Sequence, residues 1–188
     1  MWNLLPLAIL LLLTSASSSQ VAEPDGLWQG PMHSGTPNSL KGASVIDTDT
    51  FAELQRHPQT IVLDVASAEK KPESMPKDMP WMPIHRSIPG AVWLPGAGNG
   101  SKDLALEKTL KAEIGALTDH DFDRPIVTFC HPQCWASWNA AKRLVSMGYR
   151  HVYWYPEGFE GWQSNHATRV VEEEPTWKAA IRGAAESE

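Results

Sequence analysis

The chain reads Ile126-Val127-Thr128-Phe129-Cys130-His131-Pro132-Gln133-Cys134-Trp135 across the stretch that holds both of its cysteines. The first four residues form a mainly apolar run, which is typical of a strand buried in a parallel sheet. A thiol released from such a strand into a loop that opens a helix is placed for chemistry, because amides at a helix start stabilise a thiolate. We therefore expect the functional site in the hexapeptide that begins at Cys130.

Strands and helices alternate on both sides of this stretch. Apolar runs predict strands at 45–46, 61–65, 91–94, 126–129 and 152–155, and apolar residues at helical spacing predict helices over 48–55, 104–115 and 137–147. This alternation implies right-handed crossovers and an α/β fold with a mainly parallel sheet, flanked by helices on both faces. Functional sites of such sheets lie at the carboxyl ends of strands, where Cys130 is expected.

The other segments have distinct compositions. Residues 1–22 combine an apolar core with small residues and predict a secretory signal peptide, too short to span a bilayer, which needs about 20 apolar residues. Residues 23–42 predict an extended N-terminal arm, and residues 68–86, with four prolines and three methionines, predict a long surface loop. The domain proper is expected at 43–165. Residues 166–188 form a tail that can make a loosely docked helix.

Charge and cysteine content exclude several classes of protein. A net charge of −6 argues against nucleic acid or an anionic membrane as partner. Beyond the signal peptide, no hydrophobic stretch approaches membrane-spanning length. Two cysteines are too few for a disulfide scaffold, but export would bring this close pair into an oxidising compartment. The pair is therefore expected to undergo redox chemistry or to form a disulfide.

Several segments in order resemble a rhodanese-like domain. The similarity is carried by Ile61–Val65, His85–Ala91, the strand that ends at Cys130, Met147–Tyr149 and Gly158–Trp162. Together they cover 43–165. The resemblance implies that Cys130 is a nucleophile able to carry a persulfide, held in an active-site loop formed by His131, Pro132, Gln133 and Trp135.

A narrower resemblance spans nearly the whole mature chain. The segments Trp28–Gly30, Leu40–Ala43, Ile88–Gly96, Cys134–Arg143 and Val152–Tyr155 are similar to secreted CxxCW-motif proteins associated with PQQ-dependent alcohol catabolism. This implies a periplasmic accessory protein that works beside a quinoprotein dehydrogenase or its cytochrome c in redox or cofactor handling. One departure is clear, since three residues rather than two separate the cysteines here.

The loop also departs from the rhodanese pattern at Trp135. Rhodanese loops of this kind usually carry arginine five residues after the cysteine. With an apolar ring in that place, binding of an anionic sulfur donor such as thiosulfate loses its main electrostatic attraction. Thiosulfate sulfurtransferase activity is therefore an alternative function and not the leading one. The leading function is thiol redox or persulfide chemistry at Cys130, with Cys134 as its resolving partner.

The spacing of the cysteines allows a disulfide only in one conformation. Their Cα atoms lie about 6 Å apart if the segment curls like a helical turn, but about 13 Å apart if it is extended. Pro132 favours a turn, and His131 can support a thiolate near neutral pH.

Other interpretations of the pair remain open. The thiols can form a structural disulfide or stay unreactive. They can hold copper with His85, His120 or His131, which is the less favoured interpretation because nothing in the sequence pairs these histidines with the thiols. The scaffold can also be a non-catalytic binding or chaperone module for a protein or redox cofactor. Asp64, at the end of a strand, is interpreted as a loop-capping residue.

Overall fold

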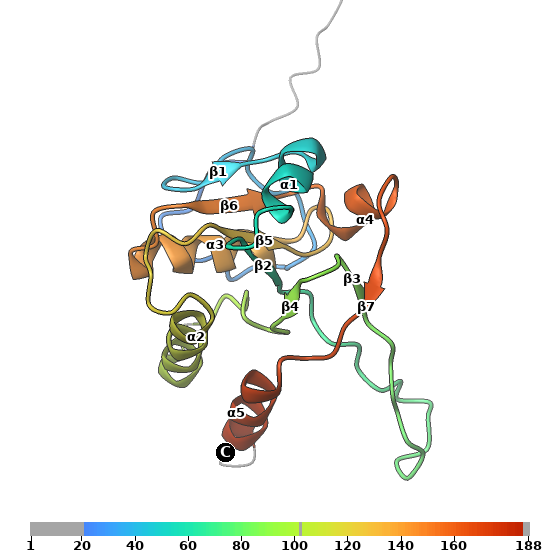
Figure 1. The fold of residues 1–188 in the computed structure, drawn as a ribbon. Coiled ribbons are helices and arrows are strands. Elements are labelled where there is room, and N and C mark those ends of the chain that lie inside the picture. The colour runs from blue at the N-terminus through green and yellow to red at the C-terminus, as the bar shows by residue number, and fades with distance from the viewer. Residues whose placement is uncertain (1–20, 102, 186–188) are drawn as a thin grey trace, which may run out of the picture.

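The computed structural model describes residues 21–101 and 103–185, so nearly all of the predicted signal peptide lies outside it. Five short strands form one parallel sheet in the order β1-β6-β5-β2-β4 (Figure 1). These strands are β1 (Ser44–Val45), β2 (Ile61–Asp64), β4 (Val92–Trp93), β5 (Ile126–Phe129) and β6 (Val152–Tyr155). The fold is α/β as predicted, with β5, the strand before Cys130, at the centre of the sheet.

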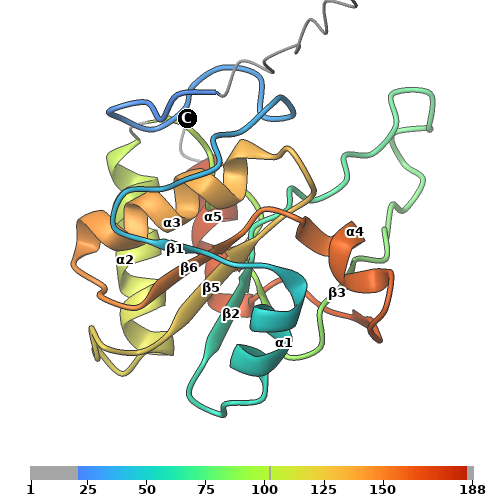
Figure 2. The same cartoon turned by 90° about the horizontal axis from the view of Figure 1, so that it is seen from above.

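Helices cover both faces of the sheet (Figure 2). They are α1 (Thr48–Gln55), α2 (Leu104–Leu117), α3 (Trp135–Met147), α4 (Gly158–Gln163) and α5 (Pro175–Ala185). One core joins the sheet to α2, α3 and α5, while a second, around Phe51 and Trp162, joins it to α1 and α4. The burial of all four residues of β5 explains why that strand is almost uniformly apolar.

Local signals predicted the boundaries of the five parallel strands and of α1, α2 and α3 to within two residues. The N-cap of α1 is Asp47, whose carboxylate accepts the amide of Thr50 at 2.9 Å. Helix α2 continues past Gly115 to Leu117, since that glycine serves close packing: an added Cβ would lie 2.8 Å from the His120 ring. Helix α3 starts at Trp135 instead of Ser137.

The C-terminal tail is integrated into the fold. Strand β7 (Arg169–Val170) pairs antiparallel with β3 (Arg86–Ser87), and neither strand was predicted. Helix α5 docks through Trp177, which is fully buried and donates its indole N–H to the Pro95 carbonyl at 3.0 Å. A helix is therefore present in this tail, as expected, and it is anchored rather than loosely docked because the buried indole of Trp177 has a hydrogen-bonded N–H.

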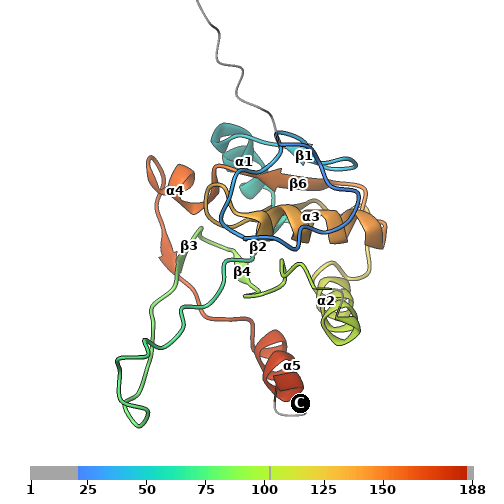
Figure 3. The ribbon, with the colours of Figure 1, turned by 180° about the vertical axis from the view of Figure 1, so that it is seen from behind.

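Two segments without regular structure complete the molecule. The loop between β2 and β3 projects from the body, as its proline-rich composition predicted (Figure 1). The N-terminal arm, drawn in blue, lies across α3 and reaches the carboxyl end of the sheet (Figure 3). None of the helices in the described residues is both long enough and apolar enough to span a membrane.

Candidate functional site

The two cysteines meet at the junction of β5 and α3. Cys130 follows the last residue of β5, and Cys134 is the N-cap of α3. Their sulfur atoms lie 2.6 Å apart, and both residues are buried. Gln133 makes the tight curl between them with a left-handed φ of 52°. The loop therefore has the curled conformation that a disulfide requires.

Helix α4 holds this loop from one side. The amide of Phe159 donates to the Cys130 carbonyl at 2.8 Å. Gly158 has a φ of 64°, and an added Cβ would lie 2.6 Å from the carbonyl carbon of His131. Only glycine fits this position, because a side chain would be strained by the backbone conformation and would also collide with the loop.

The N-terminal arm holds the loop from the other side. The Trp135 amide donates to the Met32 carbonyl at 2.8 Å, and the Ser34 amide donates to the Gln133 carbonyl at 3.0 Å. These two bonds flank an antiparallel bridge between His33 and Cys134. The arm is thus joined to the cysteine loop by an isolated β-bridge and is not a free extension.

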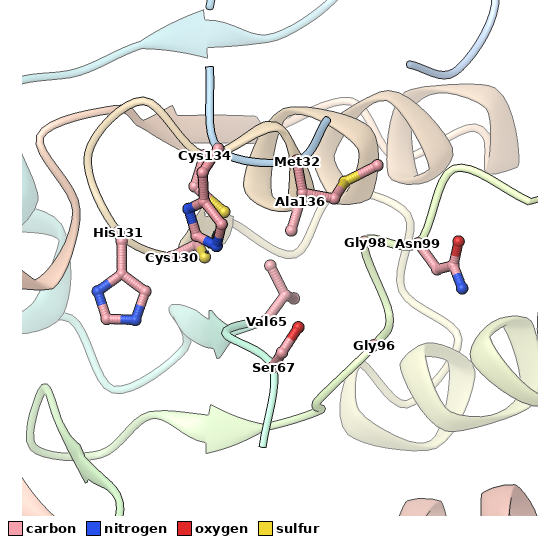
Figure 4. A pocket seen from close by; sticks show the side chains of 11 residues that line it. Met32, Val65, Ser67, Gly96, Gly98, Asn99, Cys130, His131, Cys134 and Ala136 are labelled. Carbon is pink, nitrogen blue, oxygen red and sulfur yellow. Dashed lines mark hydrogen bonds between the residues drawn. The ribbon is translucent and has the colours of Figure 1, made fainter. Parts of the chain in front are cut away.

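A cavity of about 290 Å³ opens onto the two sulfurs (Figure 4). Val65 and Ser67 lie across from the cysteines in this view, and Gly96, Gly98 and Asn99 form a further wall. The remaining lining residues are Met32, His33, His131 and Ala136. Because the sulfurs form part of the wall, a small reactant in the cavity can contact them although they are shielded from bulk solvent.

The two thiols share their protons unequally. A hydrogen bond from Cys130 lowers the pKa of Cys134 to about 6, and although burial opposes this shift, the amides of Ala136 and His131 and the charge of His33 assist it. The same sulfur contact raises the pKa of Cys130 far above its usual range, and burial raises it further. At neutral pH the pair therefore holds one thiolate on Cys134, with Cys130 as its hydrogen-bond donor.

This proton distribution predicts the pH dependence of alkylation. Cys134 ionises with a pKa of about 6 instead of 9.0, so its reaction with iodoacetamide should be fast above that pH and fall about tenfold per unit below it. Peptide mapping of the reduced protein, sampled from pH 4 to 9, should show Cys134 labelled before Cys130. Labelling of Cys130 first, or a midpoint near pH 9, would instead favour Cys130 as the first nucleophile, as its position after β5 predicts.

The predicted loop residues occupy different surroundings. His131 lines the cavity, and its Nδ1 lies 2.8 Å from a carboxylate oxygen of Glu160 on α4. Pro132 and Gln133 are exposed, whereas Trp135 is fully buried and stacks on Trp28 with ring centroids 4.3 Å apart. Trp135 does not line the cavity, and its ring contacts Trp28 of the arm and Trp138 of α3.

Asp64 caps the loop after β2, as predicted. Its carboxylate accepts the Ala66 amide at 2.9 Å and the Ser87 hydroxyl at 2.5 Å. The same carboxylate lies 2.8 Å from Nε2 of His85, which stacks on Trp93. His120 packs against Gly115, away from the cysteines. Within the described residues, no group of three His, Cys, Asp or Glu side chains gathers in a way that could hold a metal ion.

Sequence reasoning missed the cavity residues outside the cysteine loop. Met32 and His33 come from the arm, Ser67 from the segment after β2 and Asn99 from the segment after β4. The arm has no periodicity that could align it with a strand, so no local signal places His33 beside Cys134. Ser67 could have been found, because the carboxyl ends of neighbouring parallel strands meet at one edge.

The fold is that of an α/β protein in which a cysteine directly follows the central strand. The loop that begins with this cysteine lies against the first turns of α3 and α4. The chain belongs to the rhodanese-like domain family, whose model matches residues 42–165. Several solved structures are similar to it. A human single-domain sulfurtransferase is 18% identical with a TM-score of 0.43, and the match covers 66% of this chain and 99% of that one.

Two bacterial structures show the same level of similarity. SseA of Escherichia coli, a 3-mercaptopyruvate sulfotransferase with the rhodanese fold, is 18% identical with a TM-score of 0.45, and 70% of this chain matches 54% of it. The thiosulfate sulfurtransferase of Pseudomonas aeruginosa is 15% identical with a TM-score of 0.42, and 77% of this chain matches 25% of it. The chain thus spans only part of the length of these bacterial proteins.

Proposed function

We propose that the protein performs two-electron thiol redox chemistry, cycling Cys130 and Cys134 between a dithiol and a disulfide. The observation that supports this most directly is the 2.6 Å contact of the two sulfurs at the wall of a cavity. A disulfide bond of about 2.05 Å requires little further approach. The left-handed turn at Gln133 and the clamps from α4 and the arm hold the loop in this geometry.

The exchange with a substrate disulfide balances in two steps. The Cys134 thiolate attacks one sulfur of the substrate, and the other sulfur leaves as a thiolate that takes up a proton. The Cys130 thiol then loses its proton and attacks the Cys134 sulfur, which forms the intramolecular disulfide and releases the second substrate thiol. The substrate gains two electrons and the protein loses two, and the reverse direction makes the protein an oxidant.

A persulfide on Cys130 is a second route into the same disulfide. If Cys130 accepts sulfane sulfur, the Cys134 thiolate can attack the inner sulfur of that persulfide and release hydrosulfide. Among the cavity-lining residues that the structure describes, none is lysine or arginine, so a thiosulfate dianion finds no strong cation there. Thiocyanate formation from thiosulfate and cyanide should therefore be slow.

Mass spectrometry tests the proposed function. Protein from its native host, acid-quenched and alkylated, should contain a 130–134 disulfide that dithiothreitol converts to two alkylated cysteines. Neither single variant should show this intramolecular bond. The Cys130→Ser variant should accumulate mixed disulfides on Cys134, whereas the Cys134→Ser variant should accumulate a persulfide on Cys130. The proposal is wrong if neither a mild oxidant nor a sulfane donor ever produces the 130–134 bond in the wild-type protein.

We further propose that this chemistry serves a periplasmic quinoprotein alcohol dehydrogenase or its cytochrome c. The sequence resemblance to the CxxCW-motif proteins supports this role, together with the predicted signal peptide. In the native host, a strain with Cys130→Ser and Cys134→Ser should grow on alcohol as poorly as the deletion strain. If only the deletion impairs growth, the protein acts as a binding or chaperone module independent of its thiols.

A further inference from the structure

We propose that His33, in the N-terminal arm, is the group that exchanges protons with the Cys130–Cys134 pair. The inference deepens the dithiol chemistry proposed above, and it makes the arm a part of the reaction site. It is carried by the position of His33, which pairs with Cys134 across the bridge and lines the cavity that contains both sulfurs.

The arm is anchored firmly enough to place one side chain. The Asn139 side chain accepts the Trp28 amide at 2.8 Å and donates to the Trp28 carbonyl at 3.0 Å. The Ser34 hydroxyl accepts the Trp135 indole N–H at 2.9 Å. Together with the backbone bonds on either side of His33, these contacts set its register against the cysteine loop.

The chemistry needs a proton carrier at this place. Cys130 and Cys134 are 2% and 3% exposed, so protons reach the sulfurs only by way of the cavity. His33 is exposed on one side and borders the cavity on the other. An imidazole can accept and return a proton near neutral pH, and it therefore suits the passage between solvent and the buried thiols.

The other titratable groups near the cavity are less suited to carry protons to and from the thiols, because each is held by a partner. His131 is the one further histidine among the described lining residues, and its ring is held by the Glu160 carboxylate at 2.8 Å. His33 has no side-chain hydrogen bond to another described residue, and its ring centroid lies 6.4 Å from that of His131. Asp64, the remaining carboxylate that acts on Cys130, is occupied with Ser87 and His85.

Every proton that His33 accepts in one turnover is passed on to a substrate thiolate. His33 takes the Cys134 proton and becomes an imidazolium beside the thiolate. It gives that proton to the first substrate thiolate that leaves, takes the Cys130 proton as Cys130 attacks Cys134, and passes it to the second leaving thiolate. Two substrate thiols and one protein disulfide result, with His33 neutral again.

The test uses two oxidants that differ in their need for a proton. The leaving thiolate of 2-hydroxyethyl disulfide is basic and requires protonation, whereas that of 4,4′-dithiodipyridine is a weak base and does not. In the full chain, His33→Gln should slow oxidation by 2-hydroxyethyl disulfide about tenfold or more and change oxidation by dithiodipyridine less than about twofold. His57→Gln, at an exposed position just after α1, is the matched control and should change neither rate.

A purely structural role of His33 gives a different pattern. It would slow both oxidants alike, and added imidazole would not restore the His33→Ala variant, whereas our proposal requires such rescue. Equal rates for wild type and His33→Gln, or a selective loss in His131→Gln instead, would overturn the assignment. These outcomes presuppose that the wild-type pair oxidises. If it does not, the dithiol function itself fails.

Discussion

Replacing Trp135 with alanine will lower the free energy of unfolding by about 3–5 kcal/mol, the cost of removing a buried aromatic side chain. Trp135 is fully buried, stacks on Trp28 at 4.3 Å and meets Trp138 edge-on at 5.3 Å. Its loss removes the apolar platform under the arm and the indole hydrogen bond to Ser34. Urea unfolding followed by circular dichroism measures the change.

The same substitution should free the arm before the domain unfolds. Limited proteolysis should then cleave the arm near Met32 in native buffer, and both cysteines should be alkylated faster than in the wild type, because the arm covers their loop. Trp135→Phe is the matched control and should retain part of the stacking. A loss below about 1 kcal/mol for Trp135→Ala, with the arm still protected, would show that the ring is not the anchor.

Replacing Arg143 with alanine should be about as costly, at roughly 3–5 kcal/mol, because it breaks a buried ion pair on one side. The Arg143 side chain is 2% exposed, and its Nε lies 2.6 Å from a Glu107 carboxylate oxygen. The guanidinium also donates to the carbonyls of Ala97 at 3.3 Å and Ser101 at 2.9 Å. Alanine would leave these acceptors unpaired and a cavity beside them.

A comparison of variants separates charge from packing. Arg143→Met combined with Glu107→Gln removes both charges while keeping most of the volume, and it should recover at least half of the loss in urea unfolding. Glu107→Gln alone should cost less than Arg143→Ala, since the glutamate side chain is 33% exposed. Equal stability of Arg143→Ala and wild type would mean that the carbonyls of the 97–101 segment find other donors.

Local patterns predicted the elements that surround the cysteines. The apolar run 126–129 specifies a strand buried on both sides, and Gly148, with a φ of 100°, ends α3 as expected for a left-handed C-cap. The curl of the loop was also foreseeable from the cysteine spacing and Pro132. Gly115 misled the prediction because a glycine that ends a helix and one that admits a neighbouring ring look alike in sequence.

The order of residues along the chain determined the α/β class, the buried strand that ends before Cys130 and the shared loop of the two thiols, because each shows in patterns of residues close in sequence. Only the tertiary structure decided which of the two thiols holds the proton, which other residues line the cavity beside them and how the N-terminal arm packs against their loop. The Cys134 sulfur is stabilised by Cys130 across 2.6 Å, and His33, which lies 101 residues earlier in the chain, pairs with Cys134 across a β-bridge. Such electrostatic effects depend on distances in space. The sequence of the arm has no periodicity from which these distances could be predicted.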